Sequence, residues 1–329
     1  MSEPRLSLAL KDGTLHLPDT GRIAVIGPRA DQDLSALPQG RVQVITPIKP
    51  DFDVFFDAGY DCAVSADGGG PYAVALVCLP RVKVLAHARI AQAAALAPLV
   101  IVDGQKTDGA DSLLRDCRKR AEVGGVLSKA HGKLFWFQGG DFADWAAPGP
   151  ARGAHGYVTA PGVFSADGPD PASVALAAAL PAKLGRKVAD LGAGWGFLSA
   201  AVLERSGVEI LHLVEADHTA LECARQNVTD ARARFHWADA TRWRPEERLD
   251  TVVMNPPFHS GRSADPELGR AFIAAAAQML TPSGALWLVA NRHLPYEAAL
   301  RAAFERVEEV AGDTRFKILH GERPSRPAR

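Results

Sequence analysis

The residues best suited to chemistry in this chain are four in a row, Asn255-Pro256-Pro257-Phe258. They follow the apolar run 249–254, which reads as a buried strand ending where the tetrapeptide begins. Two prolines stiffen the turn, so the Asn255 amide oxygen and the Pro256 carbonyl can be held toward one point. Two acceptors without an acid suit an exocyclic amino group, and Phe258 offers a ring on which a flat base can stack. The alternative is a simple turn, since Asn-Pro dipeptides often end strands.

A glycine loop forms the second candidate site, at residues 188–196 between a predicted strand and a predicted helix. Glycine lets the backbone approach a ligand closely. A dinucleotide-binding loop would need another glycine at position 197, where Phe stands. Asp190 ends the strand, and a carboxylate there repels a pyrophosphate but attracts an ammonium group. S-adenosylmethionine carries an ammonium and no phosphate, so we expect Gly192 and Gly194 to bind its methionine end.

Two more acids follow predicted strands in the same half of the chain. Glu215 comes after the apolar run 210–214 and can accept hydrogen bonds from both ribose hydroxyls, as acids do in related nucleotide folds. Asp239 ends a third predicted strand at residues 235–239, placed to accept from an adenine amino group. Each acid alone would more often be a solvated loop residue, and only the joint spacing is specific.

These strand-ending residues need a sheet that brings them together. Four successive predicted strands end at Asp190, Glu215, Asp239 and Asn255. Ligands in open parallel sheets bind outside the carboxyl ends of the strands, so we expect all four side chains at one edge. The second half of the chain therefore predicts an α/β domain with a parallel sheet.

The first half has a similar plan without the cofactor signals. Short apolar strands are predicted at 23–26, 42–45, 73–77 and 99–102, with helices at 84–96 and 108–122. The first strand is followed by Gly27-Pro28-Arg29 rather than by a glycine-rich loop, and the third by Cys78-Leu79-Pro80 rather than by an Asn tetrapeptide. The Pro- and Gly-rich link 148–153 separates the halves, so we expect domains at 1–150 and 151–329.

Beyond these single motifs, residues from about 155 to 320 resemble a known family. The matching stretches are 161–165 (Pro-Gly-Val-Phe-Ser) with 167–168, 190–196, 255–259, 289–291, 294–296 and 315–317 (Arg-Phe-Lys). Together they resemble class I S-adenosylmethionine-dependent methyltransferases, and more narrowly the bacterial ribosomal RNA guanine-N2 methyltransferases of the 16S small-subunit type. This chain departs from the family's pattern at Ala193, where many relatives have Cys, and at Trp195, where a small residue is common.

The resemblance implies two tandem Rossmann-like methyltransferase domains, the first degenerate and serving substrate engagement or structural support. It also implies methyl transfer from S-adenosylmethionine to a guanine N2 amine in ribosomal RNA or the small ribosomal subunit. Asn255, Pro256, Pro257 and Phe258 would form the catalytic turn, and Phe164 would pack over the methionine end of the cofactor. A base inside a helix cannot reach such a pocket, so the target must be flipped out or already unpaired.

Other substrates and roles stay open at this point. Asn-Pro-Pro-Phe also suits adenine N6 and protein glutamine amides, and a non-catalytic module could bind S-adenosylmethionine or RNA. His259 follows the tetrapeptide and is a candidate base, although a surface His beside a loop is more often incidental.

Composition fits a soluble enzyme of the cytoplasm that works without a metal. The chain of 329 residues is 47% hydrophobic and 23% charged, which is typical of globular proteins. Neither a secretory signal nor a membrane-spanning run is visible. The four cysteines are widely spaced and form no metal-binding pattern. We expect a monomer.

The formal net charge of −1 does not predict a nucleic-acid-binding protein, so any RNA contact must be local. Two groups of arginines are candidates for it, one interleaved with aromatic residues and one in the tail: Arg232, Arg234, Arg242 and Arg244, then Arg323, Arg326 and Arg329. The alternative is an ordinary solvated surface.

Overall fold

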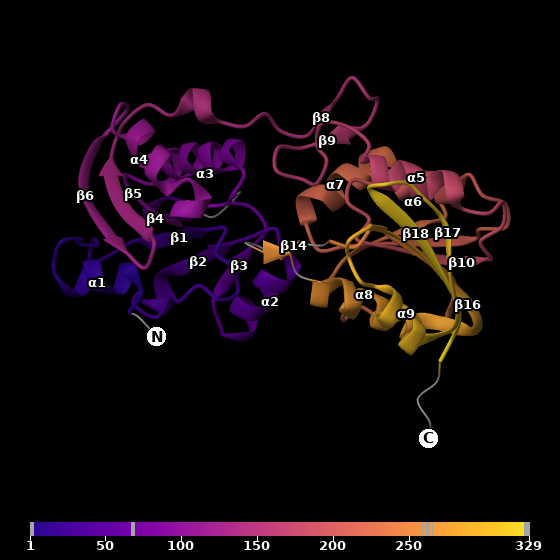
Figure 1. Cartoon of the computed structure of the whole chain (residues 1–329). Helices are drawn as coiled ribbons and strands as arrows, with labels where there is room; N and C mark the ends of the chain where they lie inside the picture. Colours follow the sequence, from indigo (N-terminus) through magenta and orange to yellow (C-terminus); the bar gives the residue numbers. More distant parts are fainter. Residues whose placement is uncertain (1–2, 67–69, 258, 261–262, 265, 326–329) are drawn as a thin grey trace. The chain divides into compact units, whose positions relative to one another are not determined.

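The computed structural model describes residues 3–66, 70–257, 259–260, 263–264 and 266–325. The chain divides into two compact units, Met1–Gly149 and Pro150–Arg329. Figure 1 shows both units, and each is an α/β fold.

The first unit is built on a seven-stranded sheet with the order β3-β2-β1-β4-β5-β7-β6. Strands β1 to β5 are parallel, and β7 and β6 add an antiparallel edge. The strands are β1 (Arg22–Ile26), β2 (Val42–Ile45), β3 (Asp61–Ala63), β4 (Tyr72–Cys78), β5 (Leu99–Gln105), β6 (Glu122–Lys129) and β7 (Gly132–Gln138). The helices are α1 (Arg5–Lys11), α2 (Lys49–Asp57), α3 (Lys83–Leu96) and α4 (Ala110–Cys117), with short 3-10 turns at Gln39–Arg41, Lys106–Asp108 and Ala143–Trp145.

The second unit repeats this plan in the order β12-β11-β10-β13-β16-β18-β17. Its strands are β10 (Lys187–Leu191), β11 (Ile210–Glu215), β12 (Ala233–Trp237), β13 (Leu249–Met254), β16 (Leu280–Asn291), β17 (Phe304–Gly312) and β18 (Phe316–Pro324). The helices are α5 (Pro171–Ala179), α6 (Phe197–Leu203), α7 (His218–Asn227), α8 (Pro266–Met279) and α9 (Glu297–Ala303). Two small hairpins lie outside the sheet, β8 (Ala151–Arg152) with β9 (Val158–Thr159) and β14 (His259–Ser260) with β15 (Ser263–Ala264).

Both faces of each sheet are covered by helices, which is why the parallel strands are almost entirely apolar. In the second unit, α5, α6 and α7 pack on one face and α8 and α9 on the other (Figure 1). Buried residues such as Val188 and Val253 face the first layer, and Ala189 and Val252 face the second. The alternation fixes the register of the strands, since a slip by one residue would exchange the two faces.

The predicted α/β class and the two domains of similar plan are confirmed. One prediction of local structure in the first unit is wrong. The helix expected at 108–122 covers only Ala110–Cys117, and Glu122 already belongs to β6. That strand was not predicted, because Gly124 and Gly125 lie inside it and glycine weakens a strand pattern. A Cβ on Gly125 would lie 2.1 Å from the Trp136 ring, so the close approach of β7 explains that glycine.

Among the described residues, no helix has both the length and the apolar character that crossing a membrane requires.

Candidate functional site

A pocket lies at the carboxyl ends of β10 and β13, which are parallel neighbours in the second sheet. Phe164, Asp190, Gly192, Gly194 and Asn255 are among the residues that line it. The structure thus brings together five of the site residues expected from sequence. The cavity measures about 40 Å³, room for a few water molecules, since one water needs roughly 10–15 Å³ of such space. These residues therefore form the floor of a site, and the bulk of a nucleoside ligand would lie outside it.

Asn255 is fixed in orientation by Asp170, the N-cap of α5, and by Ser173 in the first turn of that helix. Its Nδ2 donates to Asp170 Oδ2 and to Ser173 Oγ, both at 2.9 Å. Both amide hydrogens are therefore engaged, and no residue in the described part of the chain donates a hydrogen bond to Asn255 Oδ1. The carboxylate acceptor also sets which amide atom is nitrogen, because Asp170 cannot donate when it is ionised. The result is an amide that keeps its oxygen free to accept.

Local sequence explains why Asp170 stands where it does. It is the N-cap of α5, and its Oδ2 also accepts from Ser173 N at 2.9 Å. Asp is a favoured N-cap residue, and Pro171 follows at the first helical position, where its missing N–H costs nothing. Asp170 and Ser173 were not predicted as site residues. The capping pattern was visible in the sequence, but not the contact with Asn255, which is 85 positions from Asp170.

Asp190 is buried at the end of β10, with 1% of its surface exposed. Its Oδ2 accepts from Ser199 Oγ at 2.6 Å, while Oδ1 has no hydrogen-bond partner among the described residues. Burial raises the pKa of Asp190 to about 7, an effect that the Ser199 hydrogen bond opposes and the nearby Glu215 reinforces. A buried acceptor without a donor costs free energy, so this oxygen suits a ligand that brings a donor or a positive charge.

Three glycines of the loop after β10 adopt a backbone conformation that other residues rarely adopt. Gly192, Gly194 and Gly196 all have positive φ, at 77°, 55° and 93°. A Cβ on Gly194 would meet no atom within 4 Å, whereas one on Gly196 would lie 2.9 Å from Val228. Gly196 is therefore required for packing and backbone shape, and Gly194 leaves open space beside its backbone.

Glu215 holds this loop from the neighbouring strand. Its Oε2 accepts from Gly194 N at 2.7 Å and its Oε1 from Asp217 N at 2.8 Å. Burial raises the pKa of Glu215, and the two backbone hydrogen bonds oppose part of the rise. Glu215 is not among the residues lining the pocket. Its ribose-binding role stays a prediction. Each carboxylate oxygen has one lone pair left after these contacts, with which it can accept from a ribose hydroxyl.

Three other predicted residues also lie outside the pocket lining. Strand β12 ends at Trp237, so Asp239 lies in the turn after it rather than on the strand. Asp239 Oδ1 accepts from Thr241 N and Thr241 Oγ1, at 2.8 and 2.7 Å. Pro256 is buried and Pro257 is exposed. Phe258 lies outside the described residues, and so does the His259 side chain.

Phe164 and Trp195 meet at the edge of the pocket. Phe164 is 59% exposed, which leaves its ring available to a ligand. Trp195 stands where many relatives of the family that the chain resembles have a small residue. Although it lines the pocket, it is only 4% exposed and packs against Tyr157 and Phe197. Its Nε1 donates to the Phe164 carbonyl at 3.0 Å, so it anchors the segment that carries Phe164.

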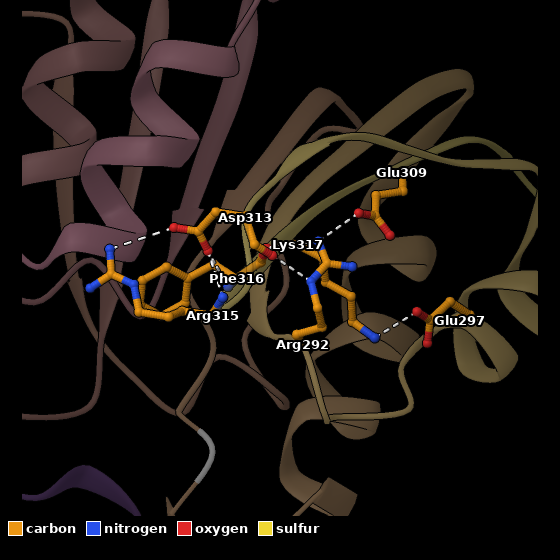
Figure 2. A network of polar contacts seen from close by, with 7 residues as sticks. All are labelled: Arg292, Glu297, Glu309, Asp313, Arg315, Phe316 and Lys317. Carbon is orange, nitrogen blue, oxygen red and sulfur yellow. Dashed lines mark hydrogen bonds and ion pairs between the residues drawn. The ribbon is translucent and has the colours of Figure 1, made fainter.

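The late Arg-Phe-Lys run sits at the same edge of the sheet, where β16 ends and β18 begins. Figure 2 shows that each cation in this corner has a partner. Arg292 binds Glu309 and the carbonyls of Asp313 and Phe316, and Arg315 binds Asp313. Lys317, 4% exposed, donates to Glu297 at 2.5 Å. The network ties β18 to α9 and the end of β16, which stiffens this side of the site.

The arginines considered as an RNA contact are partly occupied by the fold. Arg232 binds Asp230 and two backbone carbonyls, and Arg244 binds Gln278. Arg326 and Arg329 lie outside the described residues. Of the described arginines in the two groups, none lines the pocket.

Comparison with known proteins adds a family and a fold. Residues 155–320 match the model of the family described as the methyltransferase small domain. The chain is 35% identical over 145 residues to a ribosomal RNA large subunit methyltransferase G from Alcanivorax borkumensis, covering 43% of this chain and 37% of that one. It is 32% identical over 166 residues to a ribosomal RNA small subunit methyltransferase C from Hahella chejuensis, covering 50% and 48%. The chain thus spans less than half the length of these relatives.

A solved structure also resembles most of the chain. It is the T. thermophilus 16S rRNA N2 methyltransferase in complex with AdoMet and guanosine, with a TM-score of 0.77 at 23% identity. The match covers 94% of this chain and 90% of that one. It shows that both units together have the two-domain fold of that protein.

Proposed function

The chain belongs to the methyltransferase small domain family, and we propose that it transfers a methyl group from S-adenosylmethionine to the N2 amine of a guanine in ribosomal RNA. The observation that carries the proposal is the Asn255 amide, whose nitrogen is bound to Asp170 and Ser173 at 2.9 Å. Such an amide can only accept from a substrate. It suits an exocyclic amino group, which has hydrogens to donate.

Asn255 and the carbonyl of Pro256 would each accept one hydrogen of the N2 amine. That nitrogen is a poor nucleophile, because its lone pair is delocalised into the guanine ring. Two acceptors that favour a pyramidal nitrogen localise the lone pair. A preorganised contact of this kind costs no reorganisation during reaction, since Asp170 and Ser173 already hold the amide. The proton leaves after the N–C bond has formed, because the methylated amine is cationic and acidic, so no strong base is needed.

Several residues would hold the cofactor. When bound, S-adenosylmethionine supplies the methyl group from its sulfonium, and the S–C bond breaks as the N–C bond forms. Asp190 Oδ1 is buried and meets no donor from the described residues, which fits the ammonium of the methionine end. Gly192 and Gly194 would let that end approach the backbone, and the exposed Phe164 ring would pack over it. Glu215 would bind the ribose and Asp239 the adenine.

Ribosomal RNA is the substrate supported by the names of the relatives, which act on large or small subunits. We favour 16S RNA of the small subunit, because the fold of the whole chain matches a 16S rRNA methyltransferase. The stacking ring would be Phe258. The protein would act in the cytoplasm as a monomer, with the first unit engaging RNA or supporting the second.

The proposal is tested by methyl transfer from labelled S-adenosylmethionine to separate substrates: small subunits, large subunits, total tRNA and peptides. Ribosomes from a strain that lacks the gene would provide unmethylated RNA. We expect label in small-subunit RNA, recovered as N2-methylguanosine by mass spectrometry of the nucleosides. Label in N6-methyladenosine or in glutamine would assign another amine target. Cofactor binding without transfer to any substrate would indicate a binding module instead of an enzyme.

A further inference from the structure

The first unit has a cationic pocket at the carboxyl end of β5, the edge at which α/β sheets bind ligands. The cavity measures about 290 Å³, and the β6–β7 hairpin forms one of its walls. Its polar and charged lining residues are Lys106, Asp111, Ser128, Lys129, His131 and Lys133. Three lysines face one carboxylate, so the lining carries a net positive charge although the chain as a whole is at −1.

Two of the three lysines have no partner for their ammonium groups among the described residues. Lys133 donates to Ser128 Oγ at 2.9 Å and lies 3.3 Å from Asp111. Lys106 and Lys129 make only backbone contacts within the described part of the chain. An external anion would therefore meet two ammonium groups with no internal carboxylate to displace.

The β6–β7 hairpin, which presents Lys129 and Lys133, is held in a strained shape. Ala130 and His131 form its two-residue turn with φ of 49° and 55°, where Asn and Gly are the usual residues. Lys106 N donates to His131 O at 2.8 Å, and the buried Arg5 donates to Lys129 O at 3.1 Å. Strain of this kind persists where its surroundings enforce it, and it is concentrated at functional positions.

The pocket differs from the corresponding corner of the second unit, where β16 ends and β18 begins, in how its cations are neutralised. Strands β5, β7 and β6 hold the places in the first sheet that β16, β18 and β17 hold in the second. Lys106 follows β5 as Arg292 follows β16. In the second unit each cation of the corner is bound to a carboxylate (Figure 2). The same corner of the first unit keeps its cations and lacks most of the neutralising acids.

We propose that this pocket binds the phosphodiester backbone of the RNA substrate, with Lys106 and Lys129 as the principal contacts. The inference rests on the proposed function for its partner, RNA. Phosphate contacts position a nucleic acid without reading its sequence, so the pocket supplies affinity and alignment while the base is selected in the second unit. Ionised lysines near a phosphate release counterions, and binding through them weakens as salt rises.

The test compares the full-length double variant Lys106→Ala/Lys129→Ala with the wild type. Binding to a labelled 16S rRNA transcript is measured by fluorescence anisotropy at several salt concentrations. We expect affinity to fall about five- to tenfold. The slope of log K against log salt should become shallower by about 1.5, since each lost phosphate contact contributes roughly 0.7 to 0.9. In methyl transfer, KM for RNA should rise while kcat and the affinity for S-adenosylmethionine stay unchanged.

Two further variants separate charge at this place from charge in general. Lys106→Arg/Lys129→Arg keeps both positive charges and should restore most of the affinity. Lys11→Ala/Lys119→Ala removes two exposed lysines of the same unit that lie outside the pocket, and it should bind like the wild type. If the pocket variant has the wild-type affinity and salt slope, the phosphate site is wrong. Anisotropy measures binding without turnover. Failure of the phosphate site is therefore distinguishable from failure of the proposed function, in which the wild-type chain would bind RNA but methylate nothing.

Discussion

Asp170 Oδ2 accepts a hydrogen bond from Asn255 Nδ2 at 2.9 Å, across 85 positions of sequence. The N-cap of α5 thus orients the amide at the end of β13. Without this acceptor, the two orientations of the amide would differ little in energy, and in some of the molecules the nitrogen would face the substrate. The contact makes one orientation dominant.

Replacing Asp170 should therefore impair catalysis through Asn255. Asp170→Ala removes both the cap and the acceptor, and we expect kcat to fall at least about tenfold, the scale of one hydrogen bond to a charged group. Helix α5 should also be weakened by about 1 kcal/mol. Asp170→Asn keeps a good cap and a carbonyl acceptor, so its kcat should lie between those of Asp170→Ala and the wild type. Equal kcat for Asp170→Ala and the wild type, with unchanged RNA affinity, would exclude the orienting role.

Asn255→Ala should lower the rate of methyl transfer by at least roughly a hundredfold, as expected for loss of one preorganised transition-state contact. Affinity for S-adenosylmethionine should stay nearly the same, because the substitution leaves the glycine loop and Asp190 intact. Single-turnover rates and calorimetry measure the two quantities separately. In a double-mutant cycle, Asp170→Ala should cost almost nothing more once Asn255 is Ala. Additive losses would mean that Asp170 acts independently.

The sequence predicted the fold and the edge of the sheet well, because strand ends and glycine loops are local patterns. Asp190 and Asn255 follow continuous apolar runs, and parallel strands place such ends together. The partners of these residues were not predictable. Ser199 and Ser173 are ordinary small residues within helices, and only the packing of α6 and α5 on the sheet brings them to the two side chains. The same reason hid the pocket beside Lys106, where residues 106–111 meet the β6–β7 hairpin.

The first unit should depend on the buried ion pair between Arg5 and Asp103, 2.6 Å apart and with side chains 8% and 9% exposed. Arg5→Ala leaves a buried carboxylate unpaired, and we expect a loss of about 3–5 kcal/mol in the free energy of unfolding of this unit. Lys11→Ala removes one cation of the exposed pair with Glu3, at 3.7 Å, and should change it by less than about 1 kcal/mol. Urea unfolding of both variants gives the comparison. Similar small losses would show that Asp103 finds another partner.

Glu215 should contribute to cofactor affinity both as a proposed ribose acceptor and as the support of Gly194. Glu215→Ala should weaken binding of S-adenosylmethionine by roughly 1.5–3 kcal/mol, the scale of hydrogen bonds to a charged group. Free methionine has no ribose and should compete weakly with S-adenosylmethionine. If the ribose is the main contact of Glu215, the affinity for methionine should be less sensitive to the substitution. Unchanged affinity in calorimetry would refute both roles.

Cofactor affinity should also depend on pH through Asp190, whose pKa burial raises to about 7. The ionised form binds an ammonium and the protonated form does not, so affinity should rise by about tenfold from pH 6 to pH 8 and then level off. The folding stability of the ligand-free protein should change with pH in the opposite direction. A carboxyl whose folded pKa exceeds its unfolded value stabilises the fold below the unfolded pKa, near 4, and this contribution is lost as pH rises through about 7. Asp190→Asn should bind the cofactor weakly with a flat pH profile, while Ser199→Ala should keep the dependence and move it to higher pH, because the Ser199 hydrogen bond lowers this pKa. Calorimetry in buffers of different ionisation enthalpy would detect the proton released on binding at pH 6.5. A wild-type affinity for S-adenosylmethionine that does not change between pH 6 and pH 8 would mean that Asp190 does not meet the ammonium.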